Sequence, residues 1–355
     1  MENKKTYAVG LMSGTSLDGL DLVLASFQET NGRWHFSILK AETRPYSAAW
    51  KQDLTAAPKL PGETLIALHK SYGKYLGEQV NDFLKDTDLR PSLVASHGHT
   101  VFHQPVAGMV FQLGDGNVLA AETGLPVIFD FRSLDVALGG QGAPLVPVGD
   151  RLLFPEYAYC LNLGGFANIS YETDHGRIAF DLCPVNLVQS YVVRPTGKEY
   201  DKDGENGRKG SVDPVLLKCL DSLDYYRLPP PKSLGREWLE SHFYPCLDRS
   251  SASTDDKLRT VYEHISTQIC RTIQPGQPSK MLVTGGGTHN IFLMKLLNNK
   301  CPIEIVIPDE KIADYKEALI FAFLGVLRME NRINCLASVT GARKDSSSGL
   351  VVSAN

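Results

Sequence analysis

Cysteine is sparse in this chain and forms none of the patterns that mark a metal knuckle or a redox pair. The seven cysteines among 355 residues are scattered, odd in number and include no C-x-x-C pair. This usage is typical of reduced thiols in a cytosol, and it argues against a disulfide framework and against a zinc knuckle. The seven are Cys160, Cys183, Cys219, Cys246, Cys270, Cys301 and Cys335.

The chain also lacks an excess of charge of one sign. It carries 36 Lys and Arg against 40 Asp and Glu, and the net charge is −4. No basic patch with interleaved aromatic residues is present, so we expect neither nucleic acid nor an acidic membrane surface as a partner. A hydrophobic share of 43% with 21% charged residues is ordinary for a globular protein.

Long apolar runs are missing as well. The longest, residues 318–327, is shorter than a membrane span and predicts a helix buried in protein. The polar start, Met1 to Thr6, runs directly into a strand-like segment, so we expect no signal peptide and a cytoplasmic protein. A length of 355 residues predicts two domains.

Two common phosphate motifs are absent. The sequence has no G-x-x-x-x-G-K-[ST], and no G-x-G-x-x-G follows a strand and opens a helix. A P-loop enzyme and a dinucleotide-binding Rossmann domain are therefore disfavoured. Three other glycine turns are present instead: 13–19 (SGTSLDG), 163–168 (LGGFAN) and 284–290 (TGGGTHN).

These turns have the composition of phosphate sites, because glycine lets backbone N–H groups approach an anion closely. The first adds the hydroxyls of Ser13, Thr15 and Ser16. Its carboxylate, Asp18, would repel phosphate and is better understood as a ligand of Mg²⁺, through water. The third turn leads into a helix from about Asn290, and helix N-termini favour anions. Each turn could also be purely structural.

The chain repeats one arrangement in its two halves. Residues 7–27 and 157–171 each predict two strands joined by a glycine turn, and 34–39 and 177–181 predict a third strand. Hairpins mixed with helices favour an α/β fold over a purely parallel sheet, with a nucleotide cleft between two lobes. Further expected elements are helices at 63–86 and 258–273, strands at 93–96, 126–130, 280–284 and 303–307, and short surface helices in 195–236.

Asp181 is the candidate general base. It ends a predicted strand, and strand ends face the ligand site in many α/β proteins. Its alternative role is that of a turn former before a helix from Asn186.

Further polar residues follow predicted strands. Asp130 and Arg132 could bind a substrate or form a structural ion pair, and Glu317 could bind a sugar hydroxyl or favour a helix dipole. The H-x-H pattern of His97 and His99, with His103 nearby, raises a metal site, although substrate contacts fit better.

An ordered series of motifs resembles the anhydro-N-acetylmuramic acid kinases over nearly the whole chain. The most specific are M-S-G-T-S-x-D-G at 12–19 and A-L-G-G-Q-G-A-P-L-V-P at 137–147. The others are 96–100 (SHGHT), 112–115 (QLGD), 130–132 (DFR), 162–168 (NLGGFAN), 200–203 (YDKD), 231–237 (PKSLGRE), 283–287 (VTGGG), 317–319 (EAL) and 338–342 (SVTGA).

The resemblance implies an α/β fold of the actin and hexokinase type. The first ribonuclease H-like lobe would cover 1–131 with the segment 335–355, and the second would cover 132–334. It further implies ATP and Mg²⁺ as cofactors, a sugar as substrate, a homodimer, and a place in peptidoglycan recycling and amino-sugar metabolism. Water would open the 1,6-anhydro bridge at C1 while O6 takes the γ-phosphate, giving N-acetylmuramic acid 6-phosphate.

The resemblance also implies residue roles. Asp181 would be the base for the attacking water, and His97, Asp130, Arg132 and Glu317 would contact the substrate. Cofactor-binding residues would be Gly14, Thr15, Ser16, Leu17, Asp18, Gly19, Leu20, Asp21, Gly164, Gly165, Asn168, Gly285, Gly286 and Gly287, with Asp18 serving Mg²⁺.

Two segments depart from the family pattern. The family commonly has D-T-G-P-G-N where this chain has 181–186 (DLCPVN), and H-G-Q-T where it has 97–100 (HGHT). Bulk at Cys183 and Val185 beside the base leaves two alternatives open. These are a related kinase for another amino sugar and a non-catalytic nucleotide-binding protein of the same fold.

Overall fold

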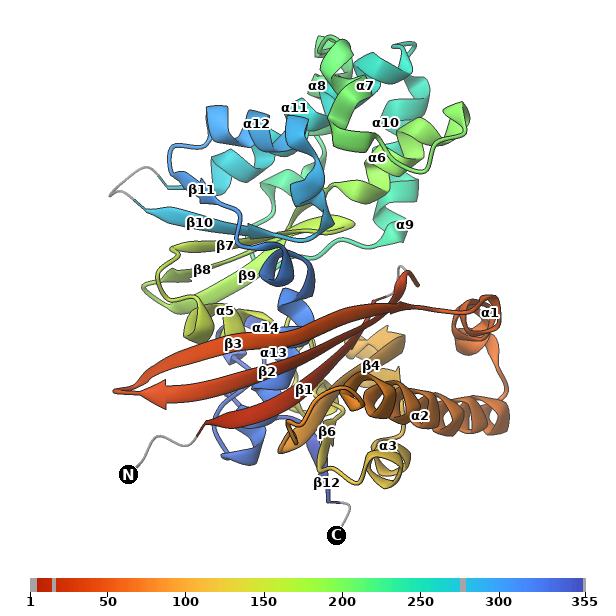
Figure 1. Ribbon diagram of the computed structural model, residues 1–355. Coiled ribbons are helices and arrows are strands. Elements are labelled where there is room, and N and C mark those ends of the chain that lie inside the picture. Colours follow the sequence, from red (N-terminus) through yellow and green to blue (C-terminus); the bar gives the residue numbers. More distant parts are fainter. Residues whose placement is uncertain (1–4, 15–16, 275–278, 354–355) are drawn as a thin grey trace. The chain divides into compact units, whose positions relative to one another are not determined.

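The structure, a computed structural model, describes residues 5–14, 17–274 and 279–353. The chain divides into two compact units, Met1–Pro155 with Tyr315–Asn355, and Glu156–Asp314 (Figure 1). The expected lobe limits at 131/132 and 334/335 both fall inside the first unit. Residues 132–155 pack there, because a Cβ on Gly149 would lie 2.6 Å from Ile320 Cγ2, and Lys316 Nζ lies 3.1 Å from Asp150 Oδ1.

The first unit is built on a seven-stranded sheet with the order β12-β6-β4-β1-β2-β3, in which β5 pairs with β4. The first three strands form an antiparallel meander, and β4 and β6 run parallel to β1 and to β4 respectively. The strands are β1 (Thr6–Ser13), β2 (Gly19–Thr30), β3 (Arg33–Pro45), β4 (Leu93–Gln104), β5 (Met109–Leu113), β6 (Val127–Phe129) and β12 (Leu350–Val352). The helices are α1 (Ala48–Ala56), α2 (Gly62–Leu84), α3 (Gly116–Thr123), α4 (Ser133–Ala137), α5 (Pro147–Leu153), α14 (Ala337–Thr340) and, from Tyr315 on, α13 (Glu310–Met329).

The second unit is built on a five-stranded sheet with the order β11-β10-β7-β8-β9. Its strands are β7 (Tyr159–Leu163), β8 (Phe166–Thr173), β9 (Gly176–Pro184), β10 (Lys280–Thr284) and β11 (Glu304–Val306). Its helices are α6 (Asn186–Val193), α7 (Glu205–Lys209), α8 (Pro214–Asp221), α9 (Arg236–Trp238), α10 (Tyr244–Arg249), α11 (Thr254–Thr272) and α12 (Ile291–Lys300), joined by short 3₁₀ and π segments.

The two sheets share one strand order. Each contains a meander of three antiparallel strands, β1–β3 in the first unit and β7–β9 in the second. In the first unit, β4 then runs parallel to β1, and β6 runs parallel to β4. In the second unit, β10 runs parallel to β7, and β11 runs parallel to β10. The repeated arrangement expected from the sequence is therefore present at the level of topology. The fold class is confirmed as mixed α/β, with two sheets.

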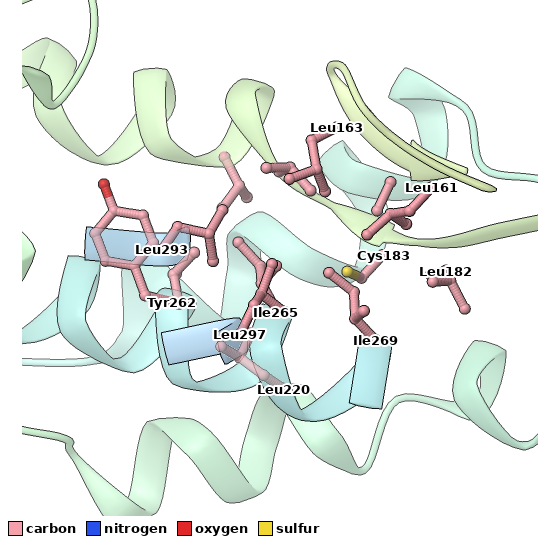
Figure 2. Packing of buried hydrophobic residues seen from close by; sticks show 14 of the residues in the cluster. Leu161, Leu163, Leu182, Cys183, Leu220, Tyr262, Ile265, Ile269, Leu293 and Leu297 are labelled. Carbon is pink, nitrogen blue, oxygen red and sulfur yellow. The ribbon is translucent and has the colours of Figure 1, made fainter. Parts of the chain in front are cut away.

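Buried apolar side chains hold each unit together. In the second unit, α11 supplies Tyr262, Ile265 and Ile269, which pack with side chains of β7 and α12 (Figure 2). In the first unit, α13 lies directly on β1, since a Cβ on Gly10 would fall 1.9 Å from the Ala318 carbonyl oxygen. The predicted buried helix at 318–327 is thereby confirmed. Across the described part of the chain, no helix combines the length and apolar character that crossing a membrane requires.

The cysteine expectation is wrong for four residues. The structure pairs Cys219 with Cys246 and Cys270 with Cys301 as disulfides. Each pair is separated by about thirty residues (27 and 31), and each joins neighbouring helices, α8 with α10 and the end of α11 with the residue after α12. The packing of the helices brings these cysteines together, so their spacing in the sequence could not indicate the pairing. Cys160, Cys183 and Cys335 are buried and belong to neither disulfide.

Candidate active site

The first glycine turn joins β1 to β2 in the first unit. Thr15 and Ser16 lie outside the described residues, and Leu17 has a φ of +61°, in the left-handed region. A Cβ on Gly19 would lie 2.7 Å from the Arg44 carbonyl oxygen, so the first residue of β2 packs closely on β3. The sequence therefore places an unusually tight backbone at this end of the sheet.

Two carboxylates flank this turn. Asp18 is exposed, whereas Asp21 is half-buried and accepts a hydrogen bond from Thr43 Oγ1 at 2.6 Å. Among the described residues, no group of three or more His, Cys, Asp or Glu side chains could hold a metal ion. Mg²⁺ commonly takes only one or two protein carboxylates, with waters and phosphate oxygens as its other ligands. Asp18 fits such a role by its chemistry and exposure.

The other two glycine turns meet in the second unit. They follow β7 and β10, which are parallel neighbours with Thr284 opposite Asn162. Both turns therefore lie at the same end of the sheet, where the carboxyl ends of these two strands meet. Gly285 has a φ of +88°, and a Cβ there would fall 2.5 Å from Asn162 Oδ1. A Cβ on Gly286, by contrast, would meet nothing closer than 3.9 Å. The backbone at Gly286 is thus open to a ligand.

The third turn does not lead straight into its helix. One turn of 3₁₀ helix, Gly286–His289, comes first, and α12 then begins at Ile291 with Asn290 as its N-cap. A hollow of about 460 Å³ lies beside this turn and is lined by Asn186, Gln189, Ser190, Tyr200, Asp201, Lys202, Asp203, Gly286, His289 and Asn290. Gln189 Nε2 is buried and makes no hydrogen bond with the described residues, which leaves a donor at this hollow.

Asp181 lies within β9, at a bulge. The pairing with β8 shifts between Ala167, opposite Cys183, and Asn168, opposite Asp181, so β9 carries one extra residue there. Bulges re-aim side chains and are frequent beside active sites. Asp181 Oδ1 accepts from Asn168 Nδ2 at 3.0 Å, and Oδ2 accepts from the Leu234 N–H at 2.8 Å.

The electrostatics of Asp181 suit a proton acceptor. Burial raises its pKa above the ordinary value, and the hydrogen bonds from Asn168 and Leu234 offset part of that rise. The backbone is also held, because Tyr225 Oη donates to the Asp181 carbonyl oxygen at 2.7 Å and the Asp181 N–H donates to Lys232. Asp181 is therefore a fixed carboxylate with a pKa shifted toward neutrality.

Three of the predicted substrate residues gather in the first unit. His97 and Asp130 line a hollow of about 200 Å³ together with Phe111, Gln112 and neighbouring residues. Arg132 approaches His97, with Nη2 2.7 Å from the histidine Nε2, and it also donates to the Gly142 carbonyl oxygen. Burial lowers the pKa of His97 to about 3 and that of Arg132 to about 10. His97 is therefore neutral, and its pairing with Arg132 argues against a metal role.

Asp130 and Glu317 differ in their surroundings. Asp130 has a φ of +53°, and its Oδ1 accepts from Ser133 Oγ at 2.6 Å, so it contacts the first residue of the short helix α4. Glu317 lies on α13, and burial raises its pKa while Lys316 and Arg132 oppose that rise. Asp130 does not pair with Arg132 in a salt bridge among the described contacts, and the ion-pair alternative therefore finds no support.

Within each unit, several residues that support the candidate side chains were not predicted. Leu234 contributes only a backbone N–H, and Tyr225 reaches the backbone of Asp181 from a short 3₁₀ segment, Asp224–Arg227. Tyr46 and Tyr72 were likewise not predicted, and they extend the hydroxyl of Ser13 into a buried chain that ends on His99. No local pattern identifies such contacts. The nearest signal is the proline- and glycine-rich run at 229–235.

Comparison with known proteins identifies the family. A model of the family "AnmK: Anhydro-N-acetylmuramic acid kinase" matches residues 6–354. A protein named anhydro-N-acetylmuramic acid kinase from Vibrio cholerae serotype O1 is 36% identical over 99% of both chains. One from Aliivibrio fischeri is 37% identical over 98% of this chain and 99% of its own.

Among solved structures, the activator of 2-hydroxyisocaproyl-CoA dehydratase from Clostridium difficile, with bound ADPNP, covers 92% of this chain and 97% of its own at 12% identity and a TM-score of 0.44. The family assignment rests on the sequence matches, which extend over nearly the full chain at more than a third identity. The chain belongs to the anhydro-N-acetylmuramic acid kinase family.

Proposed function

We propose that this protein is an ATP-dependent kinase that opens 1,6-anhydro-N-acetylmuramic acid with water and phosphorylates O6. The product is N-acetylmuramic acid 6-phosphate, formed in peptidoglycan recycling and amino-sugar metabolism. The observation that carries the proposal is Asp181, a half-buried carboxylate held by Asn168 and Leu234 near two converging glycine turns. Its raised pKa suits a group that must accept a proton from water.

Each group has a chemical task. Water attacks C1, its proton passes to Asp181, and the C1–O6 bond breaks as O6 bonds to the γ-phosphorus of ATP and ADP leaves. The open backbone at Gly286 receives nucleotide phosphate, with Gly285 and Gly287 shaping the turn. Gly164 and Gly165 with Asn168, and the turn from Gly14 to Asp21, complete the phosphate contacts. Holding the reactants in place in this way supplies much of a phosphoryl-transfer enzyme's rate.

Mg²⁺ supplies charge neutralisation on the β- and γ-phosphates when it is bound. Asp18 would hold it, through water, because this exposed carboxylate lies in the first glycine turn. His97, Asp130, Arg132 and Glu317 would hold the polar groups of the sugar. We also propose a cytoplasmic location and a homodimer, both on the family resemblance.

The departures beside Asp181 do not favour another sugar. The side chains of Leu182, Cys183 and Val185 are buried in the core of the second unit, where they pack with β7 and α11. Figure 2 shows Leu182 and Cys183 among these core residues. Their bulk therefore fills the interior and does not narrow a ligand site.

The test is direct. The protein is incubated with ATP, Mg²⁺ and either anhydro-N-acetylmuramic acid or N-acetylmuramic acid, and sugar phosphate is measured by mass. We expect phosphorylation of the anhydro sugar, and in ¹⁸O-water we expect the label at C1. No phosphorylation of either sugar would favour a non-catalytic nucleotide-binding protein, and phosphorylation of the open sugar alone would favour a related kinase.

A further inference from the structure

Strand β4 carries a bulge that separates two histidines. Leu11 of β1 pairs with Ser96, but Ser13 pairs with His99, so β4 advances three residues where β1 advances two. Gly98 makes this possible with a φ of +71°, and a Cβ there would lie 2.4 Å from the Leu113 carbonyl oxygen. No other residue fits this position without moving the backbone of β5.

The bulge gives the two rings different partners. His97 Nε2 lies 2.7 Å from Arg132 Nη2, and His97 lines the same hollow as Asp130. His99 Nδ1 lies 2.9 Å from the hydroxyl of Ser13, the last residue of β1. His99 therefore contacts the base of the first glycine turn, whereas His97 belongs to the proposed sugar site.

A chain of hydroxyls reaches Ser13 from its other side. Tyr46 Oη donates to Ser13 Oγ at 2.7 Å and lies 2.6 Å from Tyr72 Oη. A phenol has one proton, and that of Tyr46 goes to Ser13, so Tyr72 is the donor in the second bond. Tyr72, Tyr46, Ser13 and His99 are all buried, with exposures of 0%, 4%, 2% and 4%.

We propose that His99 is a positioning residue for the phosphate-binding turn. Together with Tyr46 it clamps Ser13 Oγ from two sides, which fixes the end of β1 and the direction in which the chain enters the turn at Gly14. The inference rests on the proposed function in one respect, namely that this turn binds the phosphates of ATP.

The clamp depends on a neutral imidazole, which has one bare nitrogen and one N–H. Burial lowers the pKa of His99 to about 4, so the ring is uncharged at neutral pH and makes this contact without a buried charge. Replacing the ring by an apolar side chain would leave the buried hydroxyl of Ser13 without its partner on His99. An unsatisfied buried hydroxyl costs more free energy than a pair of apolar side chains at the same two positions would. Ser13 and Gly14 are then expected to shift, which should weaken nucleotide binding.

The experiment compares three variants and one control. His99→Leu removes the ring nitrogen, His99→Asn keeps a polar atom at the position of Nδ1, and Tyr46→Phe removes the second contact to Ser13. Tyr75→Phe is the control, because Tyr75 packs against Tyr46 and Tyr72 but makes no hydrogen bond with the described residues. Binding of Mg²⁺-ADP and of a non-hydrolysable ATP analogue is measured by titration calorimetry, and KM for the sugar by kinetics.

We expect about a tenfold weaker nucleotide affinity in His99→Leu and in Tyr46→Phe, with KM for the sugar within twofold of the unmodified protein. His99→Asn should recover most of the loss, and Tyr75→Phe should bind nucleotide normally. Unchanged nucleotide affinity in His99→Leu and Tyr46→Phe would overturn the proposal. So would an equal loss for nucleotide and sugar, since that pattern indicates general destabilisation.

The readout is independent of turnover. If the protein binds nucleotide and the His99 variants weaken that binding, the positioning role stands even when no sugar is phosphorylated. If turnover is normal but the variants bind nucleotide as well as the unmodified protein does, the proposed function stands and the positioning role falls.

Discussion

The turn between the first two strands is long in one unit and short in the other, although the two sheets share a strand order. Residues 14–18 separate β1 from β2, whereas only Gly164 and Gly165 separate β7 from β8. The long turn carries its own carboxylate, Asp18. The short turn consists of two glycines and has no polar side chain of its own. The polar side chains beside it are Asn168 of β8 and Asp181 of β9. One topology thus places polar side chains beside a glycine turn in two different ways.

Removing Asp181, the proposed base in the second unit, should have the largest effect on turnover. Asp181→Asn keeps the shape of the side chain but cannot accept a proton, so we expect kcat to fall by roughly a thousandfold with nucleotide affinity nearly unchanged. Steady-state kinetics and calorimetry check this. Asp224→Asn, at an exposed carboxylate of the same unit, is the control. Retained turnover would exclude Asp181 from the mechanism.

The carboxylate of the long turn should affect the metal and not the base. Asp18→Asn is expected to raise the Mg²⁺ concentration for half-maximal activity by about tenfold, because a charge-assisted contact through water is lost. A Mg²⁺ titration at saturating ATP measures this. The exposed Asp88→Asn should leave the titration unchanged, and an unaltered Mg²⁺ requirement in Asp18→Asn would separate Asp18 from the metal.

Substitutions at Gly285 and Gly286, in the turn after β10, should affect different properties, namely stability at Gly285 and nucleotide binding at Gly286. Gly285→Ala meets Asn162 Oδ1 and needs a positive φ, so we expect a loss of stability of about 1–3 kcal/mol. Gly286→Ala meets nothing in the protein within 3.9 Å. It should keep the unfolding temperature and lose nucleotide affinity several-fold. Thermal unfolding and calorimetry on both variants decide, and normal nucleotide binding by Gly286→Ala would contradict a phosphate contact there.

The pH dependence should show the smallest effect. Asn168 lowers the pKa of Asp181 while burial raises it, so Asn168→Ala should raise that pKa further. Asp181 accepts a proton only when ionised, and therefore the acid limb of kcat should move to higher pH. Profiles of kcat against pH for the unmodified protein and for Asn168→Ala test the direction of this shift. A shift to lower pH would mean that another group sets the limb.

Much of the fold could be predicted because its signals are local. The hairpin at 7–27, the helix at 63–86 and the buried helix at 318–327 correspond to β1–β2, α2 and α13. Strand β4 runs on to Gln104, beyond the predicted 93–96, because its polar residues pair with β5. A polar segment that is stabilised by a partner strand gives no hydrophobic signal of its own.

The site was harder to predict than the fold. Glycine turns, Asp181 and His97 carry recognisable residue types, and the structure places the turns after β7 and β10 side by side. The two bulges, at Gly98 and beside Leu182, escaped prediction since an inserted residue is visible only in the register of two strands. Each bulge changes the direction of a candidate side chain. The contact from Leu234 escaped for a similar reason, because any residue can offer its backbone N–H.

The disulfides make the two units unequal in a further way. Both cross-links, Cys219–Cys246 and Cys270–Cys301, lie within the second unit, and each restricts the unfolded chain by a loop of about thirty residues. Such a loop contributes on the order of 3–4 kcal/mol. Reductant should therefore lower the unfolding temperature of the second unit and spare the first, and a thiol titration of the denatured protein should rise from three groups to seven. The environment in which the chain folds would then decide how resistant half of the molecule is to heat.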